Sequence, residues 1–205
     1  MEIKYLGWQS FRISEKKQIV LTQPYSLAQT KMLFPKSKAD LVFQNRKTKA
    51  DLAKRIEGVT RKKPFWPKGP GEYEVAGVDI RGYHSGYWFR INNFRLAFWW
   101  SLKSDETKDL VQDFPNVNIL FLKVDQSSGN FARRVKEISQ KISPEIIIPF
   151  CSENIPLVEL KNGIWAKPFL DALDQEDVKA QEKLVIGQEE IGSEESRIVL
   201  LEPKI

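Results

Sequence analysis

Few side chains in this 205-residue sequence could bind a metal or attack a substrate. His84 is the one histidine and Cys151 the one cysteine. A single cysteine excludes an intrachain disulfide and a thiolate-only metal cluster, and a single histidine removes the commonest ligand of catalytic zinc. Ser101 or Cys151 could be a nucleophile with His84 as its base, but no glycine-framed nucleophile turn surrounds either residue. The scarcity of histidine and cysteine therefore disfavours most metal hydrolase sites, and the lack of a nucleophile turn disfavours covalent catalysis.

Cationic side chains are concentrated in one segment instead. Positions 31–68 hold 12 Lys or Arg against 3 Asp or Glu, whereas 171–196 holds 9 acidic residues against 2 basic ones. Phe65 and Trp66 lie among these cations, and single-stranded nucleic acid binders use this composition for phosphate contact and base stacking. A solvated surface, partly neutralised by the acidic tail, would show the same asymmetry. The candidate binding residues are Arg46, Lys47, Lys49, Arg61, Lys62, Lys63 and Trp66.

The composition predicts one folded domain over residues 1–205, because 41% of the residues are hydrophobic and 29% are charged. No run approaches the roughly 18 apolar residues of a membrane span. The opening residues lack the apolar stretch of a signal peptide. We therefore expect a cytoplasmic protein with no membrane contact.

The order of the predicted elements indicates an α/β protein. β-favouring runs at 3–5, 11–13, 19–21 and 41–43 are followed by a helical stretch over 49–57 that ends at Gly58, and then by two hairpins, 72–81 and 87–99, the second turning at Asn92-Asn93. In the second half, predicted helices alternate with predicted strands. A helix over 105–112 is followed by a strand over 118–124, and further strands are expected at 146–148, 184–186 and 197–201. Between the strands at 118–124 and 146–148 lies a helix capped by Asn130, whose apolar positions are Phe131, Val135, Ile138 and Ile142. This pattern predicts a two-sheet core with outer helices.

Several strings also resemble a known family. YLGWQSFRI, KGPGEYEVAGVDIRG, FRINNFRLAFWWSL, NVNILFLKV and SPEIIIPFCSE are similar to segments of the metallo-β-lactamase superfamily, in the branch of small lactonase-like, metal-dependent hydrolases. The resemblance covers nearly the whole chain, and the GPGEYEV string is its most specific part. It implies a four-layer αββα sandwich.

The same resemblance implies that the metal ligands are lost. The positions of the usual H-x-H-x-D-H loop, the bridging aspartate and a later histidine carry Arg46, Thr48, Ala50, Asp51, Ser101 and Cys151. An early aspartate position carries Gln23, and the histidine of the opening string is replaced by Trp8. Two metal ions need imidazole and carboxylate ligands, so the resemblance implies a metal-free pseudoenzyme without a cofactor.

Two binding functions and one catalytic alternative follow. The basic segment predicts a nucleic acid or other polyanion as partner. The aromatic hairpin, with Trp99 and Trp100 at its end, makes a protein partner the second hypothesis. The alternative is a hydrolase with a rebuilt mononuclear metal site formed by Asp51, His84 and Cys151.

Overall fold

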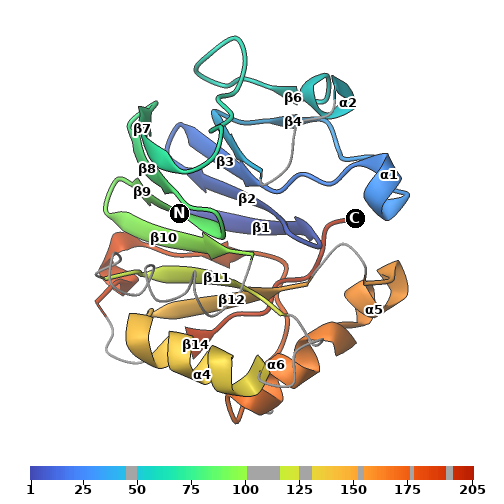
Figure 1. The fold of residues 1–205 in the computed structure, drawn as a ribbon, viewed down its shortest axis with the longest axis vertical. Coiled ribbons are helices and arrows are strands. Elements are labelled where there is room, and N and C mark those ends of the chain that lie inside the picture. The colour runs from blue at the N-terminus through green and yellow to red at the C-terminus, as the bar shows by residue number, and fades with distance from the viewer. Residues whose placement is uncertain (45–49, 101–115, 125–130, 152–154, 176–177, 193–195) are drawn as a thin grey trace.

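The N-terminal strands form a five-stranded sheet. The computed structural model describes residues 1–44, 50–100, 116–124, 131–151, 155–175, 178–192 and 196–205 (Figure 1). The strand order is β13-β1-β2-β3-β5, with β1 at Glu2–Gly7, β2 at Ser10–Glu15, β3 at Gln18–Thr22, β5 at Leu41–Phe43 and β13 at Leu184–Val185. Alternation along β1 and β2 buries Tyr5 and Phe11 on one face. The predicted early strands are therefore confirmed.

A seven-stranded mixed sheet faces the first one. Its order is β14-β12-β11-β10-β9-β8-β7, with β7 at Gly71–Val75, β8 at Val78–Gly82, β9 at Gly86–Ile91, β10 at Phe94–Trp99, β11 at Ile119–Lys123, β12 at Ile146–Phe150 and β14 at Arg197–Ile198. Both predicted hairpins are present. Ala76 and Gly77 have φ values of 54° and 75°, and Asn92 has a φ of 52°, the left-handed conformation that tight hairpin turns use.

Aromatic rings join the two sheets. The ring of Phe11, on β2, lies 4.8 Å from that of Phe121 and 5.9 Å from that of Phe150, centre to centre. Phe98 stacks on Phe150 at 4.7 Å. Since these side chains come from both sheets, they form the centre of the hydrophobic core.

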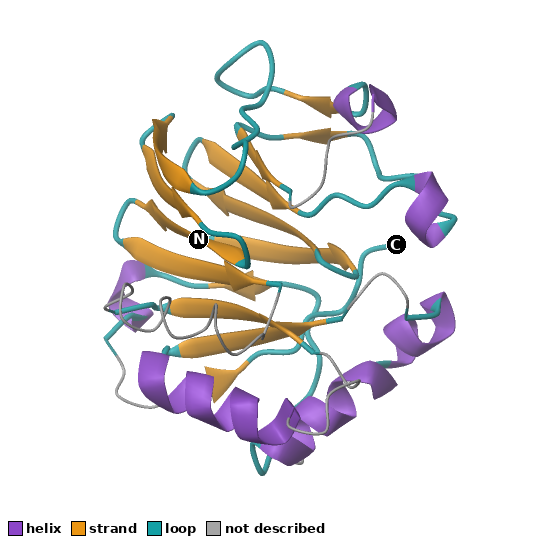
Figure 2. Cartoon of the chain, in the orientation of Figure 1, coloured by secondary structure: helices purple, strands orange, loops and turns teal. Residues whose placement is uncertain are grey.

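The longest described helix is α4 (Phe131–Ile142). It buries Val135, Ile138 and Ile142, as the predicted apolar stripe requires. With α6 (Lys167–Ala172) it lies beside the β12 and β14 end of the larger sheet, and α5 (Leu157–Asn162) lies beyond the carboxyl end of β12 (Figures 1 and 2). None of the described helices is long and apolar enough to cross a membrane.

The helix predicted over 49–57 is wrong in extent. Helix α2 covers only Ala50–Ala53, and Ile56–Glu57 forms strand β6, parallel to β4 (Ser37–Lys38). The N–H groups of Ser37 and Ala39 donate to the carbonyls of Arg55 and Glu57, and Ile56 is buried. Tertiary pairing and burial override helix propensity here. Gly58 consequently caps no helix; a Cβ there would lie 1.8 Å from the Arg61 carbonyl oxygen.

The late strands are shorter than predicted. β14 is described only to Ile198, although the Val199 N–H still donates to the Ile147 carbonyl on β12. Beyond Val199 the chain pairs with Gln181: the Gln181 N–H donates to the Leu200 carbonyl, and the Glu202 N–H donates to the Gln181 carbonyl. The short helix α1 (Leu27–Thr30), α5 and α6 were not predicted. The predicted helix over 105–112 and the cap at Asn130 lie outside the described residues.

Candidate functional site

Strands of both sheets end at a common edge of the sandwich. β3 and β5 are parallel to each other, as are β10, β11 and β12, so the carboxyl ends of each group lie together. Gln23 and Cys151 directly follow β3 and β12, and Trp8 lies in the turn between β1 and β2. These are the described residues that the family resemblance placed at ligand positions and near the edge.

Trp8 fills this edge with a buried indole. Its side chain is 2% exposed, and its ring meets Tyr25 edge to face at 4.9 Å. The Nε1–H group donates to the carbonyl of Ile155 at 3.0 Å. The backbone of Trp8 has a φ of 50°, a conformation that a bulky residue adopts only where its surroundings hold it. The indole therefore ties the first sheet to the segment after β12.

The thiol of Cys151 lies beside the phenol of Tyr5. The two atoms are 3.5 Å apart, and the Tyr5 hydroxyl also donates to the Trp8 carbonyl at 2.6 Å. Burial raises the pKa of Tyr5 well above its ordinary value, and the neighbouring Cys151 raises it further. The phenol therefore stays neutral, and it bridges Cys151 and Trp8 as a hydrogen-bonding group.

Gln23 contributes its backbone to this edge. Its N–H donates to the Phe43 carbonyl at 2.7 Å, and its own carbonyl accepts a hydrogen bond from the Ser10 hydroxyl. These bonds join the ends of β3 and β5 and hold the β1–β2 turn against β3. The arrangement is structural, because it satisfies buried backbone groups.

His84 is not in this buried cluster. It is exposed, in the loop between β8 and β9, where the N–H of Tyr83 donates to the Gly86 carbonyl. Cys151 is buried, so the two candidate groups occupy different environments.

A basic loop protrudes above the edge of the first sheet. Arg61, Lys62 and Lys63 are all exposed, and they lie between β6 and the chain that returns to β5 (Figure 1). No ion pair of these three cations occurs within the described residues. Their charge is thus presented to solvent.

Buried Asp40 holds this basic loop in place. Its carboxylate accepts hydrogen bonds from the N–H and hydroxyl of Thr60 at 2.8 and 2.6 Å, and from the N–H of Ile19 at 3.1 Å. Its carbonyl accepts from Phe65 at 2.8 Å. Asp40 is fully buried, and a buried carboxyl group requires hydrogen-bond donors such as these. The loop between Thr60 and Phe65 is therefore fixed at both ends.

Trp66 lies just beyond the basic loop. It is half-buried and packs partly against the hydrophobic core, so only part of its indole could receive a nucleic acid base. The neighbouring Phe65 ring lies 5.7 Å from Tyr73. Of the two aromatic side chains in the predicted binding segment, Phe65 is committed to packing with Tyr73.

The aromatic hairpin is mostly internal. Tyr87, Phe89, Phe94, Phe98 and Trp99 are buried. Trp100, partly buried, meets Tyr87 at 5.4 Å, and burial raises the pKa of Tyr87 to about 12. Trp99 and Trp100 therefore do not form an exposed aromatic patch, and the predicted protein partner loses that support.

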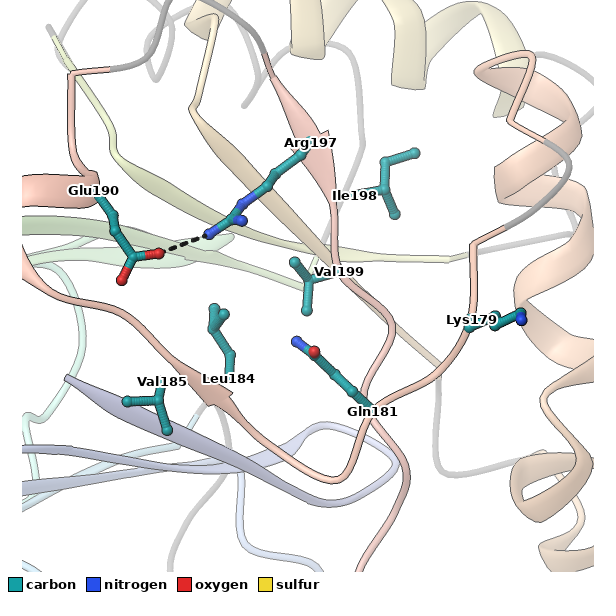
Figure 3. Close-up of a pocket in the computed structure, with 8 residues that line it drawn as sticks. All are labelled: Lys179, Gln181, Leu184, Val185, Glu190, Arg197, Ile198 and Val199. Carbon is teal, nitrogen blue, oxygen red and sulfur yellow. Dashed lines mark ion pairs between the residues drawn. The ribbon is translucent and has the colours of Figure 1, made fainter.

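A separate cavity of about 290 Å³ lies between the edge strands β13 and β14 (Figure 3). Leu184 and Val199 face it from the two sheets, and Arg197 pairs with Glu190 at 3.8 Å beside it. Lys179 and Gln181 also line the cavity, together with aliphatic side chains. The lining shows no convergent set of polar groups that would indicate a specific ligand. We assign no function to this cavity.

A family model described as a β-lactamase superfamily domain matches residues 2–151. The chain belongs to the metallo-β-lactamase superfamily. The fold expectation of an α/β sandwich of this type is confirmed. No curated protein matches the chain significantly by sequence.

Three solved structures show the same fold at low sequence identity. A protein from Thermotoga maritima, described as a putative zinc-dependent hydrolase of the superfamily, has a TM-score of 0.74 at 18% identity, with 99% of both chains covered. An isothiocyanate hydrolase from Delia radicum gut bacteria has a TM-score of 0.58 at 11% identity, covering 91% of this chain and 99% of that one. Igni18, a metallo hydrolase from Ignicoccus hospitalis, has a TM-score of 0.55 at 11% identity, covering 91% of this chain and 99% of that one.

The residues described at this edge do not fit the metal centre of the metallo-β-lactamase superfamily. The indole of Trp8 offers a hydrogen-bond donor and no lone pair, and that donor already bonds to Ile155. Gln23 carries an amide in place of a carboxylate, and Cys151 faces a neutral phenol. Within the described part of the chain, no three His, Cys, Asp or Glu side chains are grouped as metal ligands. We derive no metal-dependent step from this site.

The remaining predicted site residues are not tested. Arg46, Lys47, Thr48, Lys49 and Ser101 lie outside the described residues, and for Ala50 and Asp51 only the backbone of α2 is described. The predicted clustering of these positions, and the rebuilt site of Asp51, His84 and Cys151, stay predictions.

Sequence reasoning missed the residues that organise the site. Tyr5 looks like any inward residue of a strand, and the signal that marks it, a hydroxyl facing Cys151, exists only after folding. Asp40 had a visible signal: it is a lone carboxylate at the start of the apolar run that becomes β5. A buried charge at such a position requires donors nearby.

Proposed function

We propose that this member of the metallo-β-lactamase superfamily does not hydrolyse substrates through a metal centre and instead binds a polyanion, with single-stranded nucleic acid as the leading class. The observation that carries the proposal is the basic loop: three consecutive exposed cations on a backbone fixed by Asp40. A fixed loop loses less conformational entropy when it binds phosphates than a free one. Trp66, half-buried next to the loop, supports a base-stacking contact.

Loss of the metal reaction is the other half of the proposal. The resemblance aligns Trp8, Gln23 and Cys151 with family positions at this edge. The side chains of Trp8 and Cys151 are engaged in hydrogen bonds within the protein, and Gln23 bonds through its backbone. At the histidine position of the opening string, the buried indole of Trp8 supplies a hydrogen-bond donor in place of a metal-binding nitrogen. The relatives titled as metal-dependent hydrolases share the fold at 18% identity or less, and fold alone does not transfer their activity.

Binding should depend strongly on salt and on the basic loop. We expect labelled single-stranded RNA or DNA to bind at about 50 mM salt, with log affinity falling against log salt by about 0.7 per phosphate contact. Replacing Arg61, Lys62 and Lys63 by alanine should flatten that slope by about 2, because up to three contacts are lost. Trp66→Ala should cost about 1–3 kcal/mol if a base stacks there. Fluorescence anisotropy titrations measure all of these quantities.

A matched variant separates local contacts from net charge. Replacing Lys16, Lys17 and Lys141, which are exposed elsewhere, removes the same charge and should leave the slope nearly unchanged. If both triple variants change the slope equally, only nonspecific charge is involved and the loop assignment is wrong. Absence of binding at low salt would favour the protein-partner hypothesis.

The proposed absence of a metal centre is tested separately. Protein purified without chelator should contain far less than one equivalent of zinc by elemental analysis. Zinc that is tightly bound at one equivalent, and lost in Cys151→Ala or Asp51→Ala, would establish the rebuilt mononuclear site and contradict the proposal.

A further inference from the structure

One sheet face lies outside both the candidate site and the proposed function. Strands β7, β8 and β9 turn their outer face away from the core, and α4, α5 and α6 lie towards the opposite end of that sheet (Figure 2). An open depression of about 480 Å³ on this face is lined by Glu72, Tyr73, Glu74, Asp79, Ile80, Arg81, Trp88 and Arg90. We call it the hairpin face. Its side chains form two rows across the strands.

The first row changes sign from one end to the other. Cross-strand register places Glu74 opposite Asp79, Asp79 opposite Arg90, and Arg90 opposite Arg95 on β10. Asp79 and Arg90 are paired, with Nε 2.8 Å from Oδ2. Among the described residues, Glu74 has no cationic partner, and Arg95 contacts only the amide oxygen of Asn118, at 3.4 Å. Within the described residues, each end of the row therefore carries one charge without an ion-pair partner, negative at Glu74 and positive at Arg95.

The second row has an aromatic centre. Arg81 pairs with Glu72 at 3.3 Å and lies 5.8 Å from the centre of the Trp88 ring. Trp88 is partly exposed and lies opposite Arg81 in the register. Tryptophan and arginine are enriched where protein interfaces bury most of their binding energy.

We propose that the hairpin face binds the same face of a second copy of this chain. In this dimer the two copies are related by a two-fold axis that runs parallel to the strands and passes between β8 and β9. The rotation places β7 of one copy over β10 of the other, and β8 over β9. Glu74 then faces Arg95 of the second copy, Asp79 faces its Arg90, and Arg81 faces its Trp88. Each contact then occurs twice, as an isologous interface requires. The two end charges, which have no ion-pair partner among the residues that the structure describes, then face opposite charges in the other copy.

The charge pattern disfavours the other symmetric arrangements. An axis perpendicular to the strands would set β7 against β7 and bring the acidic side chains of both copies together. Edge-to-edge pairing of β7 would do the same. Like charges in contact oppose association and so select the first arrangement. This proposal does not depend on polyanion binding or on metal loss.

Charge reversal tests the proposal in sedimentation equilibrium of the full chain. Wild type should dimerise, and Glu74→Arg should raise the dimer dissociation constant by about tenfold or more, since it sets Arg against Arg across the interface. The double variant Glu74→Arg with Arg95→Glu exchanges the two charges and should restore the dimer. Asp171→Arg, an exposed reversal on α6, is the matched control and should change nothing.

Thermal unfolding of each variant confirms that it is folded. Trp88→Ala should also weaken the dimer, which tests the face independently of charge. A wild-type chain that stays monomeric up to about 1 mM overturns the proposal. So does a dimer that is indifferent to Glu74→Arg, because the interface would then lie elsewhere.

Discussion

Replacing Trp8 with alanine should lower the free energy of unfolding by about 3–5 kcal/mol, the range for removing a large buried aromatic side chain. Three contributions are lost together: burial of the indole, its edge-to-face contact with Tyr25, and its hydrogen bond to the Ile155 carbonyl. The main-chain strain at a φ of 50° remains in the variant, so nothing offsets the loss. Urea denaturation followed by fluorescence or circular dichroism measures the change.

Two variants calibrate this result. Trp8→Phe keeps a ring and removes the Nε1–H donor, so it should cost only about 1–2 kcal/mol. Val158→Ala, at a side chain that is 69% exposed, should cost within about 0.5 kcal/mol. A Trp8→Ala change as small as that of the Val158 variant would contradict the view that the indole has become part of the core.

The sequence predicts the strand framework well because period-two burial is a local pattern. The runs that became β1, β2, β3 and β12 alternate or are continuously apolar, and the hairpins carry turn residues that accept a positive φ. Family strings supplied the face-to-face arrangement of the two sheets, which periodicity alone does not give.

Predictions failed where a distant partner decides the local structure. Ile56 and Glu57 have a helix-compatible context, yet they pair with the β4 segment 19 residues earlier in the chain. In the same way, the chain after Val199 pairs with Gln181 and no longer with β12. Such choices depend on which backbone groups remain unpaired in the folded chain, and a window of neighbouring residues does not contain that information.

The sequence predicts which residues lie at the candidate site, but it does not predict what their side chains contact there. Replacement of a histidine by Trp8 was visible in the opening string, but the string does not say whether the indole points into the edge or out to solvent. Its hydrogen bond to Ile155, 147 residues later, decides that question. The same holds for Tyr5, whose role depends on Cys151 at the end of β12.

Phe11→Ala should destabilise the chain by a similar amount, about 3–5 kcal/mol, for a different physical reason. Phe11 is fully buried and belongs to the smaller sheet, while three of its ring neighbours, Phe98, Phe121 and Phe150, belong to the larger one. Its removal opens a cavity between two sheets that are each held by their own hydrogen bonds. Rigid sheets close such a cavity poorly, so the cavity contribution is not recovered.

Comparison with a conservative change distinguishes this cavity from simple loss of hydrophobic area. Phe11→Leu retains most of the buried volume and should cost roughly half as much. Leu33→Ala, at a side chain that is 58% exposed, should have almost no effect. Equal losses for Phe11→Ala and Phe11→Leu would mean that the aromatic contacts themselves, each worth about 0.5–1.5 kcal/mol, hold the sheets together. A loss below about 1 kcal/mol for Phe11→Ala would mean that the sheets can move together, contrary to the rigid sandwich inferred from the aromatic contacts between them.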